Sequence, residues 1–211
     1  MLKDCKLYVI IDSDVIKNRD ILKTTEDVLR GGADIIQLRD KSSSDRSFLQ
    51  CANEIKKLAK KYKRLFLIND RVDIAHVADA DGVHIGQDDL PIEEARKILG
   101  AKIIGVSTHN LKEAKTAEKK GADYIGIGPV FKSKTKKGLT PIGLSILRRM
   151  SKPMKIPFFA IGGISLDNIP KVKKAGVGRV AVVSSAIKTK NVYLSVRRLK
   201  EAITSGDVSI M

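Results

Sequence analysis

The sequence predicts an α/β fold, a single-domain (β/α)8 TIM barrel spanning residues 1–211, and two observations carry this prediction. Eight short apolar, β-branched runs alternate with helix-like stretches, which is the element order of such a barrel. The runs are nearly continuous in apolar residues, as expected of parallel strands that helices cover. Because 211 residues lie near the lower limit of this fold, the loops are expected to be short.

The predicted strands follow one another along the whole chain. They are the runs at 7–12, 34–39, 64–70, 82–86, 102–107, 124–128, 157–163 and 179–185. Helix-like stretches between them include 44–63, 91–99, 111–120 and 168–174. Three helix-to-strand transitions read "LRGGADIIQLR", "EKKGADYIGIG" and "KKAGVGRVAVV", in which glycine follows the helix as a left-handed cap requires.

The alternative architecture is a doubly wound open sheet. Such a sheet usually has fewer strands and often a glycine-rich phosphate loop after the first one. Here "LYVIIDSD" carries no GxGxxG pattern, and GxxxxGK[ST] does not occur in the sequence. No linker or low-complexity tract divides the chain, and only the tail 204–211 is expected to fray. The barrel is therefore favoured.

The composition limits the class of partner. The net charge of +16 favours phosphorylated partners, although much of the lysine, as in "EIKKLAKKYKR", is typical of a solvated helix surface. An aromatic content of 4% argues against a single-stranded nucleic-acid binder. Cys5 and Cys51 lack metal-ligand spacing and are expected to be reduced core thiols. No signal-like start or apolar run of about 20 residues occurs, so we expect a cytoplasmic protein without a membrane partner.

Polar side chains gather where the predicted strands end, which is where barrels of this kind carry their chemistry. In "QLRDK", the alternation of an extended chain places Gln37, Arg39 and Lys41 on one side, and Asp40 on the other, where it can cap or pair. The other strand ends carry Asn69, Asp70, Gln87, Asp88, Asp89, Ser107, Gly162, Gly163, Ser184 and Ser185.

Two aspartates are candidates for a metal site. Mg²⁺ prefers one or two carboxylates completed by water and phosphate oxygens, and Asp70 with Asp88 or Asp89 fits that set. The alternative is that each carboxylate caps the helix that follows it. Spacing does not choose between Asp88 and Asp89.

Three loops are candidates for anion binding. "AIGGIS" offers backbone amides that can approach a phosphate closely, and "VVSSAI" adds hydroxyls near a helix start. Alone, the glycine pair is explained equally well by a tight turn. The loop "FKSKTKK" after the sixth strand is interpreted as a lid over an anionic ligand, or alternatively as a solvated basic loop.

The three histidines point to no hydrolase. His84 lies inside a predicted strand, as a satisfied core histidine would, and His76 and His109 are expected in a surface helix and a loop. None pairs with a Ser or Cys nucleophile in a recognisable pattern.

The motifs "QLRDK", "IND", "ADGVHIGQDDLP", "IIGVSTH", "GADYIGIGPVF", "AIGGIS" and "AVVSSAI" occur in order along the chain. Over about residues 6–188 this set resembles the thiamine-phosphate synthase (thiamine-phosphate pyrophosphorylase) family. The resemblance implies a Mg²⁺-dependent transferase, with one ion per active site. It would condense 4-amino-2-methyl-5-hydroxymethylpyrimidine diphosphate with thiazole phosphate, or its carboxylated precursor, to give thiamine phosphate and diphosphate.

The resemblance also implies the roles of individual residues. Arg39, Lys41, Ser107 and Lys136 would be catalytic, and Asp70 and Asp89 would bind Mg²⁺, which selects the second of the two adjacent aspartates. The pyrimidine diphosphate would be bound by Gln37, Leu38, Arg39, Asp40, Lys41, Asn69, Ser107 and Lys136. The thiazole phosphate would be bound by Ser133, Lys134, Thr135, Gly163, Val183 and Ser184.

One loop departs from the family pattern. The family commonly reads Phe-Pro-Thr-x-Thr-Lys where this chain has Phe-Lys-Ser-Lys-Thr-Lys at 131–136. Serine keeps the hydroxyl, whereas lysine in place of proline removes a fixed φ and predicts a looser loop.

The residue types also suggest a mechanism. Cations and a metal site are present but no activated nucleophile is evident, so we expect a dissociative step through a pyrimidine carbocation.

Three rival functions are weighed against the synthase. A thiazole tautomerase of the same barrel family needs neither the metal carboxylates nor the diphosphate cations. A phosphosugar isomerase would need an acid–base pair that the matching positions lack. A non-catalytic nucleic-acid-binding barrel would show one continuous basic stripe rather than polar strand ends. The oligomeric state stays open.

Overall fold

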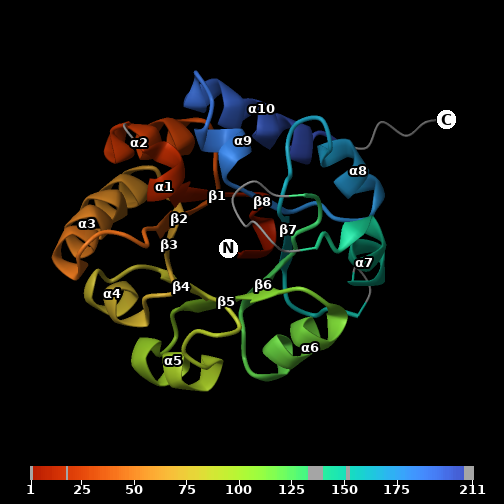
Figure 1. Ribbon diagram of the computed structural model, residues 1–211, viewed down its shortest axis with the longest axis horizontal. Helices are drawn as coiled ribbons and strands as arrows, with labels where there is room; N and C mark the ends of the chain where they lie inside the picture. Colours follow the sequence, from red (N-terminus) through yellow and green to blue (C-terminus); the bar gives the residue numbers. More distant parts are fainter. Residues whose placement is uncertain (1, 18, 133–139, 151–152, 207–211) are drawn as a thin grey trace.

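A computed structural model of the chain describes residues 2–17, 19–132, 140–150 and 153–206. Parallel strands pair in sequence order and close into a barrel, which helices surround (Figure 1). The predicted (β/α)8 architecture is confirmed. The strands are β1 (Leu7–Asp12), β2 (Ile35–Arg39), β3 (Leu65–Asn69), β4 (Gly82–Ile85), β5 (Ile103–Thr108), β6 (Tyr124–Ile127), β7 (Phe158–Ile161) and β8 (Val180–Val182).

The helices lie outside the barrel, and several of them begin at a residue of a type that favours helix starts. Ser44, Asn110 and Asn191 each accept a backbone N–H of the first turn of α3, α6 and α10. The helices are α1 (Ser13–Ile16), α2 (Ile21–Arg30), α3 (Asp45–Lys61), α4 (Val72–Val77), α5 (Ile92–Leu99), α6 (Leu111–Lys119), α7 (Gly143–Met150), α8 (Ile169–Lys174), α9 (Ser184–Ile187) and α10 (Val192–Thr204). In the part of the chain that the structure describes, no helix combines the length and apolarity that crossing a bilayer requires.

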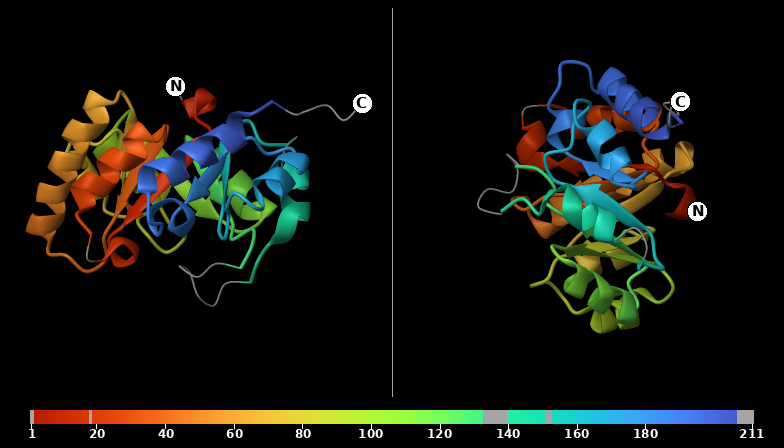
Figure 2. Two further views of the ribbon diagram at one scale, coloured as in Figure 1. Left: turned by 90° about the horizontal axis from the view of Figure 1, so that it is seen from above. Right: turned by 90° about the vertical axis from the view of Figure 1, so that its right-hand side faces the viewer.

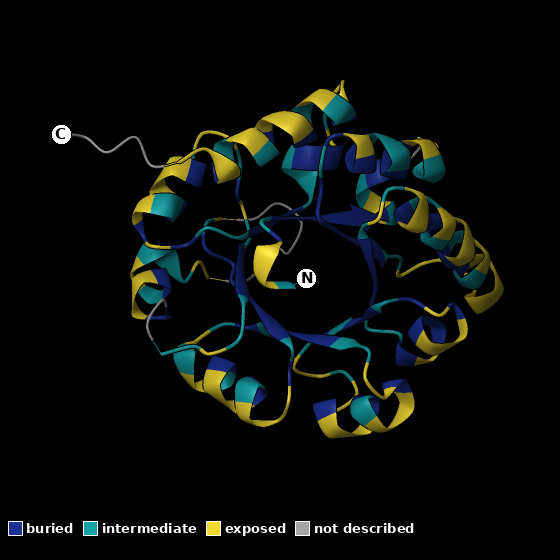
Figure 3. Cartoon of the chain, turned by 180° about the vertical axis from the view of Figure 1, so that it is seen from behind, coloured by how far each residue is buried: buried dark blue, intermediate teal, exposed yellow. Residues whose placement is uncertain are grey.

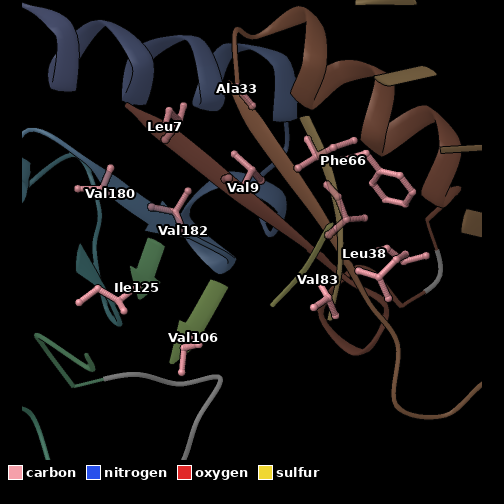
Figure 4. Packing of buried hydrophobic residues seen from close by; sticks show 14 of the residues in the cluster. Leu7, Val9, Ala33, Leu38, Phe66, Val83, Val106, Ile125, Val180 and Val182 are labelled. Carbon is pink, nitrogen blue, oxygen red and sulfur yellow. The ribbon is translucent and has the colours of Figure 1, made fainter. Parts of the chain in front are cut away.

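Two apolar clusters hold the barrel. The larger one lies between strands and helices and includes Leu7, Val9, Val180 and Val182, as Figure 4 shows. The helices bury the face that packs on the strands and expose the opposite one (Figure 3). The smaller cluster fills the inside of the barrel with Cys5, which precedes β1, and with alternate strand residues, namely Tyr8, Ile10, Ile35, Leu65, Leu67, Tyr124, Phe159 and Ala181.

The short 3₁₀ turn η1 (Leu2–Asp4) lies across the end of the barrel at which the strands begin (Figures 2 and 3). Leu2 packs against the inner cluster, and Cys5 belongs to it. One end of the barrel is therefore closed by the chain itself, which leaves the carboxyl ends of the strands for a site.

Carboxylates join strands at this closed end. Asp34, Asp81 and Asp123 each precede an even-numbered strand and accept the N–H of the residue opposite on the preceding strand, at 3.0 Å from Leu7, 2.7 Å from Phe66 and 2.8 Å from Ile104. The fourth such position, before β8, carries Arg179, which donates to the carbonyl of Lys3 at 2.7 Å. Each aspartate thus satisfies a strand-end amide.

Candidate active site

A cavity of about 450 Å³ opens at the carboxyl ends of the strands. Side chains and backbone from all eight strands line it, together with the loops after β6, β7 and β8. Its polar lining includes Asp12, Gln37, Arg39, Asn69, His84, Ser107, Thr108, His109, Lys132, Ser165, Ser184 and Ser185. A site at this end is expected of the fold.

The end of β2 presents Gln37 and Arg39 to the cavity, as the alternation predicted, whereas Lys41 does not line it. The parallel register aligns Gln37 with Ile10 and Arg39 with Asp12 on β1. Arg39 Nη1 donates to Asp12 Oδ2 at 2.7 Å, and the Asp12 side chain is 1% exposed against 24% for Arg39. Asp12 therefore holds one nitrogen of the guanidinium and leaves the rest of the fork for a ligand.

Sequence reasoning missed Asp12. The signal was present, since Tyr8, Ile10 and Asp12 alternate in "LYVIID" just as Gln37 and Arg39 do in "QLRDK". An aspartate that ends the first strand could have been assigned to the site by the same argument.

Lys41, Asp70 and Asp89 form a second polar group. Lys41 Nζ pairs with Asp70 Oδ2, and Asp89 Oδ2 accepts the Gly86 N–H at 2.6 Å. Burial and then the neighbouring Asp70 raise the pKa of the Asp89 carboxyl, outweighing the opposing Gly86 hydrogen bond. None of these three residues lines the cavity, but Asp70 directly follows Asn69, which does.

The helix-capping interpretation of these aspartates is wrong. The N-cap residues of α4 and α5 are Arg71 and Pro91, and neither helix start receives a side-chain hydrogen bond from its cap. Asp70 instead has φ +59° and donates its N–H to the His84 carbonyl at 2.8 Å. A left-handed conformation at a non-glycine residue is uncommon, and here it accompanies a carboxylate held at the strand end.

Asp70 and Asp89 fit a divalent cation. Paired carboxylates, one with a raised pKa, are the charge pattern that a cation stabilises. Asp88 is exposed and makes no contact of this kind, so the geometry favours Asp89. The ranges that the structure describes hold no group of three or more His, Cys, Asp or Glu side chains suited to a metal. Two carboxylates plus ligand oxygens match what Mg²⁺ accepts.

The opposite side of the cavity is built from backbone. Gly162 and Gly163 adopt φ +95° and +64°, and a Cβ on Gly163 would lie 2.5 Å from the Lys132 carbonyl oxygen. Glycine is therefore required for the turn after β7 to pack on the loop after β6. Val183 and Ser184 lie beside this turn, at the start of α9.

A chain of polar side chains runs through the barrel interior below the cavity. Gln37 Nε2 donates to the Tyr8 hydroxyl, which lies 3.1 Å from that of Tyr124. The Tyr124 hydroxyl lies 2.9 Å from His84 Nδ1, and His84 Nε2 lies 2.9 Å from Ser107 Oγ. The sequence predicted a satisfied histidine at position 84 but not the two tyrosines that connect it to Gln37.

Several predicted site residues lie elsewhere. The Leu38 side chain is buried in the outer cluster, and Asp40 accepts hydrogen bonds from Ser42 and Ser43 of its own loop. Neither side chain lines the cavity. Ser133, Lys134, Thr135 and Lys136, with the lid that they would form, lie outside the described residues.

Comparisons with known proteins agree with this arrangement. The sequence model of a family described as thiamine monophosphate synthase matches residues 7–186. A thiamine-phosphate synthase of Halalkalibacterium halodurans is 45% identical over 193 residues, covering 90% of this chain and 92% of that protein. One from Methanococcus maripaludis is 42% identical, covering 94% of each chain. A solved thiamine phosphate pyrophosphorylase of Pyrococcus furiosus superposes with a TM-score of 0.87 at 40% identity, covering 94% and 95%.

Proposed function

The chain belongs to the thiamine monophosphate synthase family. We propose that the cavity is its active site, in which a pyrimidine diphosphate is condensed with a thiazole phosphate. The chain is accordingly a transferase, a thiamine-phosphate synthase. The substrates of this proposal are 4-amino-2-methyl-5-hydroxymethylpyrimidine diphosphate and 4-methyl-5-hydroxyethylthiazole phosphate, or the carboxylated form of the latter. The products are thiamine phosphate and diphosphate.

One observation carries the proposal: cations paired with carboxylates lie at the carboxyl ends of neighbouring strands. Arg39 lines the cavity beside its buried partner Asp12, and Lys41 pairs with Asp70. A diphosphate needs several positive groups, and a guanidinium fork and an ammonium suit its oxygens. In our proposal Gln37 and Asn69 bind the heterocycle, while Arg39, Lys41, Ser107 and Lys136 bind the diphosphate.

Asp70 and Asp89 would hold Mg²⁺. When bound, the ion supplies positive charge to the oxygens of the leaving diphosphate. The Lys41 ammonium is the counter-charge of Asp70 in the structure, and in our proposal it also binds the diphosphate. A tautomerase would have no use for this pair of carboxylates, which favours the synthase.

The proposed chemical step is dissociative. The bond between the pyrimidine methylene carbon and the diphosphate oxygen breaks, and its electron pair leaves with the diphosphate. The side chains of Arg39, Lys41 and Ser107 stabilise the negative charge that develops there. The thiazole nitrogen then donates its lone pair to the methylene cation, which forms the new carbon–nitrogen bond.

The turn after β7 and the start of α9 would hold the thiazole phosphate. The glycine turn brings backbone close to the cavity, and Ser184 and Ser185 add hydroxyls beside it. Gly163, Val183 and Ser184 contribute on this side in our proposal. Ser133, Lys134 and Thr135, which lie outside the described residues, are the other ligands of the thiazole phosphate in our proposal.

The proposal has a direct test. The protein is mixed with Mg²⁺ and both phosphorylated heterocycles, and thiamine phosphate is followed by the fluorescence of its oxidised form. We expect product that depends on Mg²⁺ and on both substrates. Absence of product at every Mg²⁺ concentration would reject the proposed reaction, while isomerisation of the thiazole alone would favour a tautomerase.

A further inference from the structure

We infer that Tyr8, Tyr124 and His84 form a directed hydrogen-bond relay that orients the Gln37 amide and leaves the Ser107 hydroxyl hydrogen for the ligand. The three are positioning residues, since they act on the ligand through the two ends of the relay. This inference deepens the proposed function and rests on it for the identity of the ligand. The hydrogen-bond direction itself does not depend on that function.

The relay is continuous, and Gln37, Tyr8 and Tyr124 within it are buried. Its four links join β2 to β1, β1 to β6, β6 to β4 and β4 to β5. Tyr8 and Tyr124 are 2% and 0% exposed, and Gln37 is 1% exposed. Buried polar groups need partners, and here the partners are one another. Both ends of the chain, Gln37 and Ser107, line the cavity.

The direction follows from counting hydrogens. Gln37 donates from Nε2 to the Tyr8 oxygen, so the Tyr8 hydrogen is left to serve the link to Tyr124. The Tyr124 hydrogen must then serve His84 Nδ1. His84 accepts at Nδ1 and carries its hydrogen on Nε2, from which it donates to Ser107 Oγ. The Ser107 hydrogen remains for the ligand, as do the Gln37 carbonyl oxygen and the second N–H of the Gln37 amide.

Burial keeps the tyrosine hydrogens in place. Removal from water raises the pKa of Tyr8 and of Tyr124 above the ordinary tyrosine value. Both hydroxyls therefore stay protonated and can each serve as one donor and one acceptor. An ionised hydroxyl would break the one-hydrogen-per-link pattern.

Packing fixes the rings that carry the relay. Tyr8 and Tyr124 meet edge-to-face at 6.0 Å between centroids, and both pack edge-to-face on Phe159. A Cβ on Gly105 would lie 2.0 Å from Tyr124 Cζ, so glycine is needed there to admit the ring. The glycine at position 105 therefore leaves the space that the Tyr124 ring occupies.

The relay determines which hydrogen-bonding groups the cavity offers to the ligand. The buried Gln37 carbonyl oxygen needs an N–H or O–H donor on the ligand, and the Ser107 hydrogen needs an acceptor atom. An amino-substituted heterocycle that carries a diphosphate offers both. A ligand without a donor for Gln37 would leave a buried carbonyl oxygen unpaired, which costs more than a missing apolar contact.

The tautomer of His84 is the first test. We would record long-range ¹H–¹⁵N spectra of the ligand-free protein with ¹⁵N-labelled histidine and assign His84 by its loss in His84→Gln. We expect a neutral ring with its hydrogen on Nε2. A hydrogen on Nδ1, or on both nitrogens, would overturn the inferred direction.

The second test cuts the relay while keeping the rings. Tyr124→Phe removes the central hydroxyl, and Tyr62→Phe is the matched control because its hydroxyl bonds to Glu26 away from the cavity. We expect Tyr124→Phe to raise the KM for the pyrimidine diphosphate about tenfold, the cost of one buried hydrogen bond, and to leave the KM for thiazole phosphate unchanged. Tyr8→Phe should act in the same way and serves if Tyr124→Phe does not fold.

The outcomes separate this inference from the proposed reaction. An Nε2–H tautomer in a protein that forms no thiamine phosphate would keep the relay and reject the reaction. Normal turnover with an unchanged pyrimidine KM in both folded relay variants would reject the relay and keep the reaction. An equal rise in both KM values would indicate a general loss of structure and would likewise overturn the positioning role.

Discussion

Arg39 is the residue on which the proposed chemistry depends most. Its guanidinium lines the cavity, and loss of one such electrostatic contact typically costs on the order of 10²–10³ in rate. We therefore expect Arg39→Ala to lower kcat/KM for the pyrimidine diphosphate in that range, measured by steady-state kinetics. Arg197→Ala, which removes an exposed arginine of α10 paired with Glu201, is the control and should behave as the wild type. Near-wild-type turnover of Arg39→Ala would contradict the role that we propose for Arg39.

Asp12 tests whether Arg39 must be held in place. Asp12→Asn keeps the shape of the side chain but removes the charge opposite Arg39 Nη1. Because small misplacements of a catalytic group can cost on the order of 10²-fold, we expect a fall in kcat of that size with Arg39 still present. Thermal melting followed by circular dichroism would establish that the variant is folded. If kcat stays unchanged in the folded variant, Asp12 has no part in orienting the guanidinium.

At the scale of elements, carboxylates stabilise the closed end of the barrel. Asp34 accepts the N–H groups of Lys6 at 2.8 Å and Leu7 at 3.0 Å, and it pairs with Lys200 of α10. Asp34→Ala leaves these donors without their acceptor, which costs about 1–3 kcal/mol in the free energy of unfolding. Urea unfolding should show the loss. Glu201→Ala, at an exposed pair, should leave the transition unchanged.

The same carboxylate predicts a pH dependence. Burial raises the pKa of Asp34, but the hydrogen bonds from Leu7, Lys200 and Lys6 outweigh it, and the net pKa is lowered. A lowered pKa in the folded state contributes stability above the unfolded value of about 3.9 and loses it as the pH falls through the folded value. The difference in unfolding free energy between the wild type and Asp34→Asn should therefore be constant near neutral pH and shrink below about pH 4. A difference that grows on acidification would contradict this.

The strands and helices could largely be predicted from the sequence, but the residues at which they end could be predicted less well. The run at 7–12 matches β1, whereas the run predicted at 179–185 shortens to Val180–Val182. The difference at β8 arises because Ser184 and Ser185 already belong to α9, and local propensity does not show where a strand gives way to a helix.

Site residues could be predicted from the sequence where the alternation of side chains along one strand determines which of them face the cavity. They could not be predicted where the contacts run across the barrel between distant strands. Gln37 and Arg39 face the cavity as "QLRDK" indicated. The links from Tyr8 to Tyr124 and from Tyr124 to His84 join residues 116 and 40 positions apart, and no local pattern encodes them. The choice between Asp88 and Asp89 also required the folded loop, in which Asp89 turns back to Gly86.

For the whole molecule, we propose that the chain is one cooperative domain. Each strand of the closed barrel pairs with two neighbours, so no strand can leave without breaking two ladders. Unfolding by guanidinium should therefore give coincident transitions in far-ultraviolet circular dichroism and tyrosine fluorescence. Two separated transitions would show that the barrel unfolds in parts.

The most direct test of the account is calorimetric titration of the protein with inorganic diphosphate, with and without Mg²⁺. We predict that diphosphate binds tightly only when Mg²⁺ is present, because in our proposal Asp70 and Asp89 would hold the ion beside the diphosphate. A folded double variant, Asp70→Asn with Asp89→Asn, should lose the Mg²⁺-dependent part of the affinity. Equal binding with and without Mg²⁺, or in the double variant, would contradict the account.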